Sequence, residues 1–263
     1  MNKSFYTVEK LEEGTFRIDE CGRDNCYLLL GEEDTLLIDC SIGTGHLPTL
    51  LSTLTRLPVT VAATHAHGDH AGAGYQFPAL FVPKEEITLN FRIQNLRFYR
   101  RKLLSNTMKK QGITKKNIDG SIFRAKWLPM EDGRVFDLGG RTVRTFRVPG
   151  HTAGSTVFAD ETRRLLFLGD SICPVLPMHT YRCLPLSSWL PGARRVLTLA
   201  NEGYTMFCGH GDGRMSAELL AQQIAWVQEI LKQYPHNEAK HRRAFYPEFS
   251  AEGCVGFDPA NLY

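Results

Sequence analysis

The sequence predicts a single α/β domain that carries an inserted block of helices. Three observations support this class. Short apolar strand patterns alternate with a helical pattern in the first eighty residues, the same texture returns from residue 141, and the stretch between them is helical and basic. The chain has 263 residues, 43% hydrophobic and 22% charged, a globular composition that excludes a disordered, collagen-like or coiled-coil protein.

The predicted strands are short and apolar, and most of them end at a turn or a polar residue. They span residues 14–18, 25–30, 35–38, 59–63, 80–82, 141–148, 155–158, 164–168 and 204–208. Two segments show apolar residues at helical spacing: the segment 47–57, which Pro58 follows, and the amphipathic segment 215–234. This order of elements indicates one domain over residues 1–263 rather than two independent ones.

The net charge of +3 is distributed unevenly along the chain. Residues 84–126 contain twelve basic and three acidic side chains, a net charge of +9, which leaves −6 for the rest of the chain. Within this block, residues 85–112 have a long helical pattern with few strand signals. The composition shift marks residues 84–126 as a helical, basic insertion within the domain.

The seven cysteines are odd in number, irregularly spaced and without a C-x-x-C pair. They therefore predict reduced, buried thiols rather than a disulfide framework or a zinc ribbon. No apolar run approaches the roughly 18 residues that a membrane span requires, and the N-terminus lacks the apolar region of a signal peptide. These features favour an intracellular, cytoplasmic protein.

Three histidines and one aspartate fall within six residues directly after the predicted strand 59–63. His65 and His67 are two residues apart, so in extended backbone both rings leave the same side of the chain. Asp69 and His70 follow a glycine and can face the same point from another direction. Neutral imidazole and carboxylate are ligands that zinc takes in open, water-bearing sites, so the segment predicts metal binding.

Three later loops each place a further metal-ligand type behind a predicted strand. His151 lies in a Pro-Gly-His-Thr segment, Asp170 in Gly-Asp-Ser and His210 in Gly-His-Gly. Because sites in α/β sheets gather where strands end, these loops are expected to converge on the first motif.

In these motifs and their order the chain resembles the metallo-β-lactamase superfamily, in its glyoxalase-II-like branch. The resemblance runs over nearly the whole chain and implies a four-layer αββα sandwich with the metals at one edge of the two sheets. The implied ligands form two sets and a bridge between them: His65, His67 and His151; Asp69, His70 and His210; and the bridging Asp170.

The resemblance also implies supporting roles around two divalent metal ions. Asp39, at the end of the strand 35–38, would accept a hydrogen bond from a ligand imidazole, and Thr152 would do similar work. Zinc is the first choice, and iron or manganese are alternatives because His and carboxylate suit all three. Asp69 would take the proton when the reaction intermediate collapses. The commonest zinc β-lactamases have cysteine at the position of Asp170, so penicillin hydrolysis is not expected.

The implied reaction is attack of a metal-bridging hydroxide on an ester, thioester or lactone. Inserted helices commonly cover the metals in this superfamily, so residues 84–126 are expected to form a lid whose charge attracts an anionic substrate. The alternative is that its Lys and Arg side chains only solvate exposed helix faces. Candidate substrate contacts lie in the lid and in an irregular loop after Asp170: Tyr99, Arg100, Arg101, His179, Tyr181 and Arg182.

Two other activities of the same superfamily stay open: a mononuclear iron dioxygenase acting on persulfide sulfur, and a phosphodiesterase or nuclease. A nucleic-acid partner is not expected, because the chain lacks a flexible basic arm or aromatic residues interleaved with the basic ones. A small-molecule substrate is expected, and no membrane partner. The apolar tail, residues 242–263, either seals a sheet edge or forms a contact in a homo-oligomer.

Overall fold

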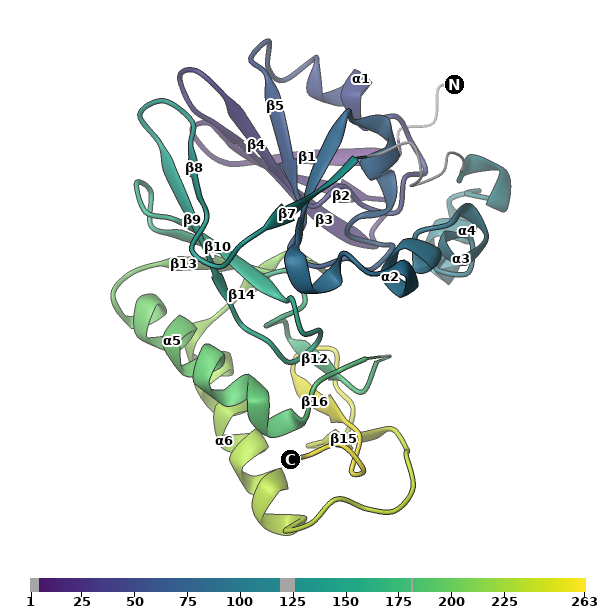
Figure 1. The fold of residues 1–263 in the computed structure, drawn as a ribbon, viewed down its shortest axis with the longest axis vertical. Coiled ribbons are helices and arrows are strands. Elements are labelled where there is room, and N and C mark those ends of the chain that lie inside the picture. The colour runs from purple at the N-terminus through teal and green to yellow at the C-terminus, as the bar shows by residue number, and fades with distance from the viewer. Residues whose placement is uncertain (1–4, 119–125, 181) are drawn as a thin grey trace.

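Two large sheets pack face to face in the computed structural model, which describes residues 5–118, 126–180 and 182–263 (Figure 1). The first sheet has the order β1-β2-β3-β4-β5-β6-β7: Tyr6–Glu12, Thr15–Glu20, Asp24–Leu30, Thr35–Ile38, Val59–Ala62, Ala79–Pro83 and Lys126–Met130. The second has the order β14-β13-β11-β10-β9-β8: Arg214–Met215, Thr205–Phe207, Leu165–Phe167, Thr156–Asp160, Thr142–Arg147 and Val135–Asp137.

Alternating side chains along the central strands divide the apolar core into layers. In β3, Cys26 and Leu28 face the outer layer that contains α1 (Leu47–Leu51), whereas Leu29 faces the second sheet. On the second sheet, Phe158 faces the first sheet. Its neighbour Val157 packs in the layer that contains residues of α5 (Leu190–Asn201) and α6 (Ala217–Gln233). The αββα sandwich that the resemblance implied is thereby confirmed.

Strand directions bring the loops of interest to one edge of this sandwich. β4 and β5 are parallel, so the residues that follow Ile38 and Ala62 leave the first sheet on the same side. β11 and β13 are also parallel, and β9 runs in their direction because β10 is antiparallel to both β9 and β11. The loops after β9, β11 and β13 therefore leave the second sheet together.

The helical predictions were only partly right. The segment 215–234 is confirmed as α6, whose N-cap Ser216 accepts a hydrogen bond from the Leu219 amide. The segment 47–57 ends early as a helix: α1 covers only Leu47–Leu51. The hydroxyls of Ser52 and Thr53 then donate to the backbone carbonyls of Thr49 and Leu50, and such bonds compete with the helical pattern.

In residues 84–118, the described part of the basic block before β7, the helices are short rather than one long helix. They are α2 (Leu89–Gln94), α3 (Arg97–Arg100) and α4 (Asn106–Lys110), and Lys126 begins strand β7. Asn95 ends α2 by donating its side-chain amide to the carbonyls of Phe91 and Ala66. Gly112, with a φ of 76°, follows α4 in the left-handed region that favours glycine.

A small third sheet, in the order β12-β16-β15, holds the C-terminal tail against the rest of the chain. β12 spans Val175–Met178, β15 Ala244–Tyr246 and β16 Cys254–Phe257. β16 is parallel to β12 and buried along its length. The tail therefore pairs with β12 within the chain, and a contact in a homo-oligomer stays a prediction.

The described cysteine side chains are all free thiols, and only Cys183 is not buried, as the sequence predicted. Among the described residues, no helix is long and apolar enough to cross a membrane.

Candidate metal centre

The loop after β5 is held by backbone and side-chain hydrogen bonds on both sides. The amide of Thr64 donates to Asp39 Oδ1 at 2.7 Å, and the amide of Cys40 donates to the carbonyl of His70 at 2.7 Å. The amides of His70 and Ala71 donate to the carbonyl of His67, which forms the turn that brings His70 back toward the sheet. The four potential ligands of this loop are thus positioned by backbone before any metal binds.

Three histidine rings meet at one side of the site. His65 Nε2 lies 3.1 Å from His67 Nδ1, and His151 Nε2 lies 3.0 Å from the same atom. Burial and the neighbouring imidazoles lower the pKa of His65 well below its usual range and that of His67 to about 3; burial also lowers the pKa of His151. The surroundings therefore favour neutral imidazole here, the form that binds metal.

The remaining potential ligands meet on the other side, around Asp170. His210 Nε2 lies 3.1 Å from Asp170 Oδ1 and His70 Nε2 lies 3.4 Å from it, while His151 Nε2 is 3.6 Å from Oδ2. Burial opposes charging of His70 and His210, but Asp170 outweighs it, raising the pKa of His210 to about 9 and that of His70 well above its usual range. Despite burial, both imidazoles hold the pKa of Asp170 well below its usual range.

The structure brings the seven sequence-predicted ligands together in one cluster. Three sets have ligand atoms within 4.8 Å of one another: His65, His67 and His151; His65, His70 and Asp170; and Asp69, His70 and His210. Asp170 faces both sides.

The donor atoms fit divalent metal ions. His70 Nε2 and Asp170 Oδ1 are buried and have no hydrogen-bond partner within the described part of the chain. Burying polar atoms without a partner costs free energy, and a coordinated cation would satisfy both of them. The set consists of imidazole and carboxylate without thiolate, which suits zinc, iron or manganese.

Asp39 lies where the sequence predicted a supporting residue. Its Oδ2 is 2.9 Å from His70 Nδ1 and also accepts from the Thr64 hydroxyl at 3.0 Å. A carboxylate on Nδ1 leaves Nε2 as the atom that faces the site. Asp39 has a φ of 61°, a conformation that aspartate and asparagine tolerate better than other non-glycine residues.

Two site residues could not be found from the sequence: Arg23, in the turn before β3, and Asp24, the first residue of β3, whose Oδ1 lies 3.5 Å from His210 Nδ1. Arg23 Nη2 donates to Asp69 Oδ2 at 2.8 Å, and its carbonyl lies 2.8 Å from His210 Nδ1. Burial opposes ionisation of Asp69, but His70 and Arg23 together lower its pKa below the usual range. Nothing in the local sequence pattern marks Arg23, because it reaches the site only through the pairing of β2 and β3.

Glu86 is a further missed residue, and it explains where Thr152 points. The buried carboxyl of Glu86 accepts from the Ala66 amide between two histidines, from the Thr152 hydroxyl and, at 3.1 Å, from the Gly154 amide. Burial raises the pKa of Glu86 to about 7. Thr152 therefore bonds to this carboxyl and to Ser155, and acts on the site only through Glu86.

The start of the basic block supports the histidine loop. The ring of Phe91 lies 5.9 Å from that of His67, and Asn95 donates to the Ala66 carbonyl. Arg100 is fully buried, with Nε on the carbonyl of Asn95 and Nη1 on that of Ile42. The prediction that Arg100 contacts substrate is therefore corrected, because backbone carbonyls already occupy its guanidinium.

The other predicted substrate contacts are exposed or packed against residues other than the ligands. Tyr99 is 40% exposed with Lys102 over its ring, and Arg101 lines a separate cleft of about 550 Å³ with Lys102, Lys109 and Lys115. His179 packs edge-on against Phe245, at 5.4 Å between ring centres. Arg182 is exposed, and Tyr181 lies outside the described residues.

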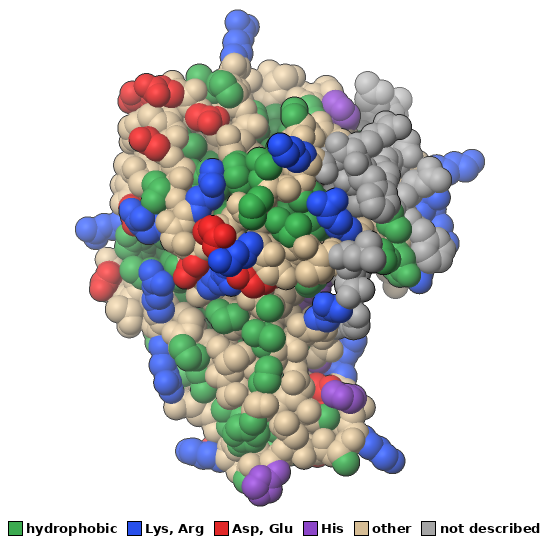
Figure 2. Space-filling model, in the orientation of Figure 1, with side chains coloured by type: hydrophobic (Ala, Val, Ile, Leu, Met, Phe, Trp, Pro, Cys, Tyr) green, Lys and Arg blue, Asp and Glu red, His purple; other side chains and the backbone are tan. Residues whose placement is uncertain are grey.

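Figure 2 shows basic side chains projecting at its right-hand edge, the edge at which Figure 1 places α3 and α4. Most of the acidic side chains visible in Figure 2 lie toward the left of the upper half of the molecule.

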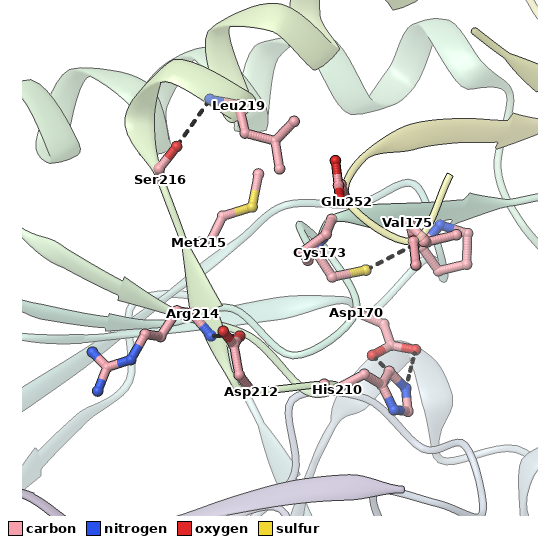
Figure 3. Close-up of a pocket in the computed structure, with 14 residues that line it drawn as sticks. Asp170, Cys173, Val175, His210, Asp212, Arg214, Met215, Ser216, Leu219 and Glu252 are labelled. Atoms are coloured by element: carbon pink, nitrogen blue, oxygen red, sulfur yellow. Dashed lines mark hydrogen bonds and ion pairs between the residues drawn. The ribbon is translucent and has the colours of Figure 1, made fainter. Parts of the chain in front are cut away.

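A larger cleft, of about 820 Å³, opens directly from the metal-ligand cluster. Asp170 and His210 form its inner end (Figure 3). Apolar residues form most of its walls: Cys173, Pro174, Val175, Met215, Leu219 and Ala251. None of the described residues that were predicted as substrate contacts lines this cleft.

With this fold and this site, the class of the protein is defined. Residues 20–211 match the model of the metallo-beta-lactamase superfamily, and the chain belongs to that superfamily.

Among curated proteins, the chain is 27% identical over 223 residues to an acyl-coenzyme A thioesterase, MBLAC2, of Homo sapiens, covering 76% of this chain and 78% of that protein. It is 26% identical over 232 residues to the protein of the same name from Bos taurus, with the same coverage. Over a shorter stretch of 121 residues, 43% of this chain and 35% of the relative, it is 30% identical to an atrochrysone carboxyl ACP thioesterase of a Cryptosporiopsis strain.

Solved structures share the fold. A metallo-beta-lactamase from Pontibacter korlensis superposes with a TM-score of 0.61 at 16% identity, covering 85% of this chain and 99% of that one. A metallo-beta-lactamase family protein from Thermus thermophilus superposes with a TM-score of 0.56 at 22% identity, covering 87% of this chain and 85% of that one.

Proposed function

We propose that this chain is a metal-dependent thioesterase that hydrolyses acyl thioesters of an anionic carrier such as coenzyme A. The observation that carries the proposal is the cluster of seven donor residues, two of which, Asp170 and His210, also line an apolar cleft. The similarity to proteins named as thioesterases acting on coenzyme A and carrier-protein substrates supports thioesters over other esters and lactones.

In this proposal His65, His67 and His151 would hold one divalent ion, Asp69, His70 and His210 would hold a second, and Asp170 would be shared by the two sets. Zinc is the first choice. When bound, such ions supply hydroxide near neutral pH and polarise the substrate carbonyl.

The chain's own residues orient and protect this chemistry. Asp39 fixes the tautomer of His70, and Glu86 ties together the two loops that carry the three-histidine set. Hydrolysis consumes one water: its hydroxide adds to the carbonyl carbon, the C–S bond breaks, and the proton that the water lost passes to the departing thiolate. Asp69 is the proposed carrier of that proton, and Arg23 occupies one of its oxygens.

The test is turnover of a panel of acyl-CoA thioesters, lactones and phosphodiesters before and after metal removal. Treatment with a chelator should abolish thioester hydrolysis, and added zinc should restore it. Metal-independent turnover would contradict the proposal. Oxygen consumption that depends on iron, or preferred cleavage of phosphodiesters, would point to the other activities of the superfamily instead.

A further inference from the structure

We propose that the apolar cleft binds the acyl chain of the thioester and selects substrates by chain length. This inference rests on the proposed function. It adds which part of the substrate the cleft binds and which residues limit the length of the acyl chain. The cleft is continuous with the metal-ligand cluster, because Asp170 and His210 belong to both. A thioester carbonyl held at these ligands can therefore extend its chain directly into the cleft.

Two facing walls give the cleft its apolar character. Met215 and Leu219, from β14 and the first turn of α6, lie on one side, and Cys173 and Val175, before and within β12, lie on the other (Figure 3). At about 820 Å³ the cleft falls within the size range of small-molecule sites. An alkyl chain that enters it leaves water for apolar surface at each added methylene.

Several polar groups of the cleft are engaged by the protein. Ser216 Oγ accepts from the Leu219 amide at 3.1 Å, and Asp212 Oδ1 accepts from the Arg214 amide at 2.9 Å. Arg214 Nη2 lies 3.3 Å from a carboxylate oxygen of Glu9. These bonds reduce what the cleft offers to an amide-rich pantetheine arm, and its apolar walls suit a hydrocarbon better.

The charged side chains of the cleft also favour an acyl chain over the coenzyme A head group as its occupant. Asp212 and Glu252 line the cleft together with Arg214, but Arg214 pairs with Glu9, so the carboxylates repel the phosphates of a coenzyme A head group. The head group is therefore expected to leave the site in another direction, while the uncharged acyl chain occupies the cleft.

The experiment measures kcat/KM for saturated acyl-CoA thioesters from two to sixteen carbons with the zinc-loaded wild type and two variants. Leu219→Trp and Ala251→Trp each fill the cleft from a different wall, and Ala251 is exposed, so its replacement leaves the core intact. Glu218→Trp is the matched control, since Glu218 is the exposed neighbour of Leu219 and does not line the cleft.

In the wild type, kcat/KM should rise about fourfold with each methylene until the cleft is full, the factor that corresponds to about 0.8 kcal/mol per buried methylene. The two cleft variants should lose at least about tenfold on twelve-carbon and longer chains while keeping acetyl-CoA hydrolysis, because only long chains reach the blocked part. Glu218→Trp should match the wild type on every chain length.

Binding of the uncharged fluorescent probe N-phenyl-1-naphthylamine gives a second readout that needs neither metal nor turnover. Its affinity should fall at least about tenfold in both cleft variants and stay unchanged in Glu218→Trp. An equal loss of kcat/KM on short and long chains would place the thiol arm in the cleft and overturn the inference. Turnover and probe binding that both substitutions leave unchanged would also overturn it. Probe binding that follows the prediction without any thioester hydrolysis would instead refute the proposed function and leave an apolar site.

Discussion

The two sides of the metal-ligand cluster differ in how their surroundings shift the pKa of the imidazoles. On the three-histidine side, burial and neighbouring imidazoles lower the pKa of His65 and His67, which favours neutral rings. On the other side Asp170 raises the pKa of His70 and His210 despite their burial, which favours protonated rings in the metal-free chain. Metal binding to the three histidines therefore displaces fewer protons than metal binding to the other set.

The difference arises from what surrounds each imidazole rather than from the residue types. The three-histidine side is enclosed by Phe91 and by the loops that Glu86 ties together. The Asp170 side is built from carboxylates, with Asp39 and Asp69 close to the rings. Replacing individual side chains around the imidazoles should affect the two sides differently. The expected effects can be ordered by size.

The largest effect is expected for Asp170→Asn, because Asp170 lies between the two ligand sets. Thioester kcat/KM should fall by more than about 100-fold, beyond the range for losing an outer partner of a ligand. In the metal-free variant the pKa of His210 should also fall from about 9 toward its ordinary value, while His67 keeps its low pKa. Steady-state kinetics and NMR titration of the imidazoles measure the two effects.

Asp137→Asn is the control for that variant, since Asp137 is an exposed acid on β8 that belongs to neither the cleft nor the ligand cluster. Its catalytic effect should stay within about twofold. A small effect of Asp170→Asn on both catalysis and the pKa of His210 would contradict the bridging position.

The next effect is expected for Asp39→Asn, which keeps the shape but removes the charge on His70 Nδ1. Loss of such an outer partner should weaken metal binding by about 10- to 100-fold. Competition with a chelating dye measures the affinity of each ion. If the affinity falls instead for the ion at the three histidines, the assignment of Asp39 to the other side is wrong.

Glu86 offers a pH-dependent test of the three-histidine side. Its pKa is raised by burial from 4.5 to about 7, so the folded state holds the proton more tightly than the unfolded chain. The stability that this proton contributes is fully present below pH 4.5 and is lost as pH rises through about 7. The loss corresponds to roughly 3 kcal/mol.

Urea unfolding of the metal-free wild type and Glu86→Gln, at about pH 4.5 and about pH 8, measures this contribution. The wild type should lose more stability between these values than the variant does, because glutamine does not titrate. Parallel pH profiles would show that Glu86 titrates normally in the folded chain.

The smallest effect is expected in the basic cleft of Arg101, which lies outside the ligand cluster. If its charge attracts an anionic substrate, Arg101→Glu should raise KM for an acyl-CoA severalfold, by about 1 kcal/mol or less, and leave an uncharged N-acetylcysteamine thioester unaffected. Arg194→Glu, an exposed charge reversal on α5, is the matched control. An unchanged KM for acyl-CoA would favour the interpretation that these side chains only solvate the helices.

The sequence predicted those parts of the molecule whose signals are local. The ligands could be found because each follows a strand whose apolar pattern is visible, and the αββα sandwich followed from the resemblance. Arg23 and Glu86 could not be found, because strand pairing and loop packing bring them to the site from distant positions. Arg100 had the charge of a substrate contact, but its burial against Ile42 depends on tertiary packing.

The central claim is that the two ligand sets together bind two divalent ions and that thioester hydrolysis depends on both. The most direct test is a zinc titration of the chelated protein, with bound metal and hydrolysis of an acyl-CoA measured at each step. The account predicts that two ions bind per chain and that activity is complete only when the second has bound. Saturation at one ion with full activity, or activity that is independent of zinc, would contradict it.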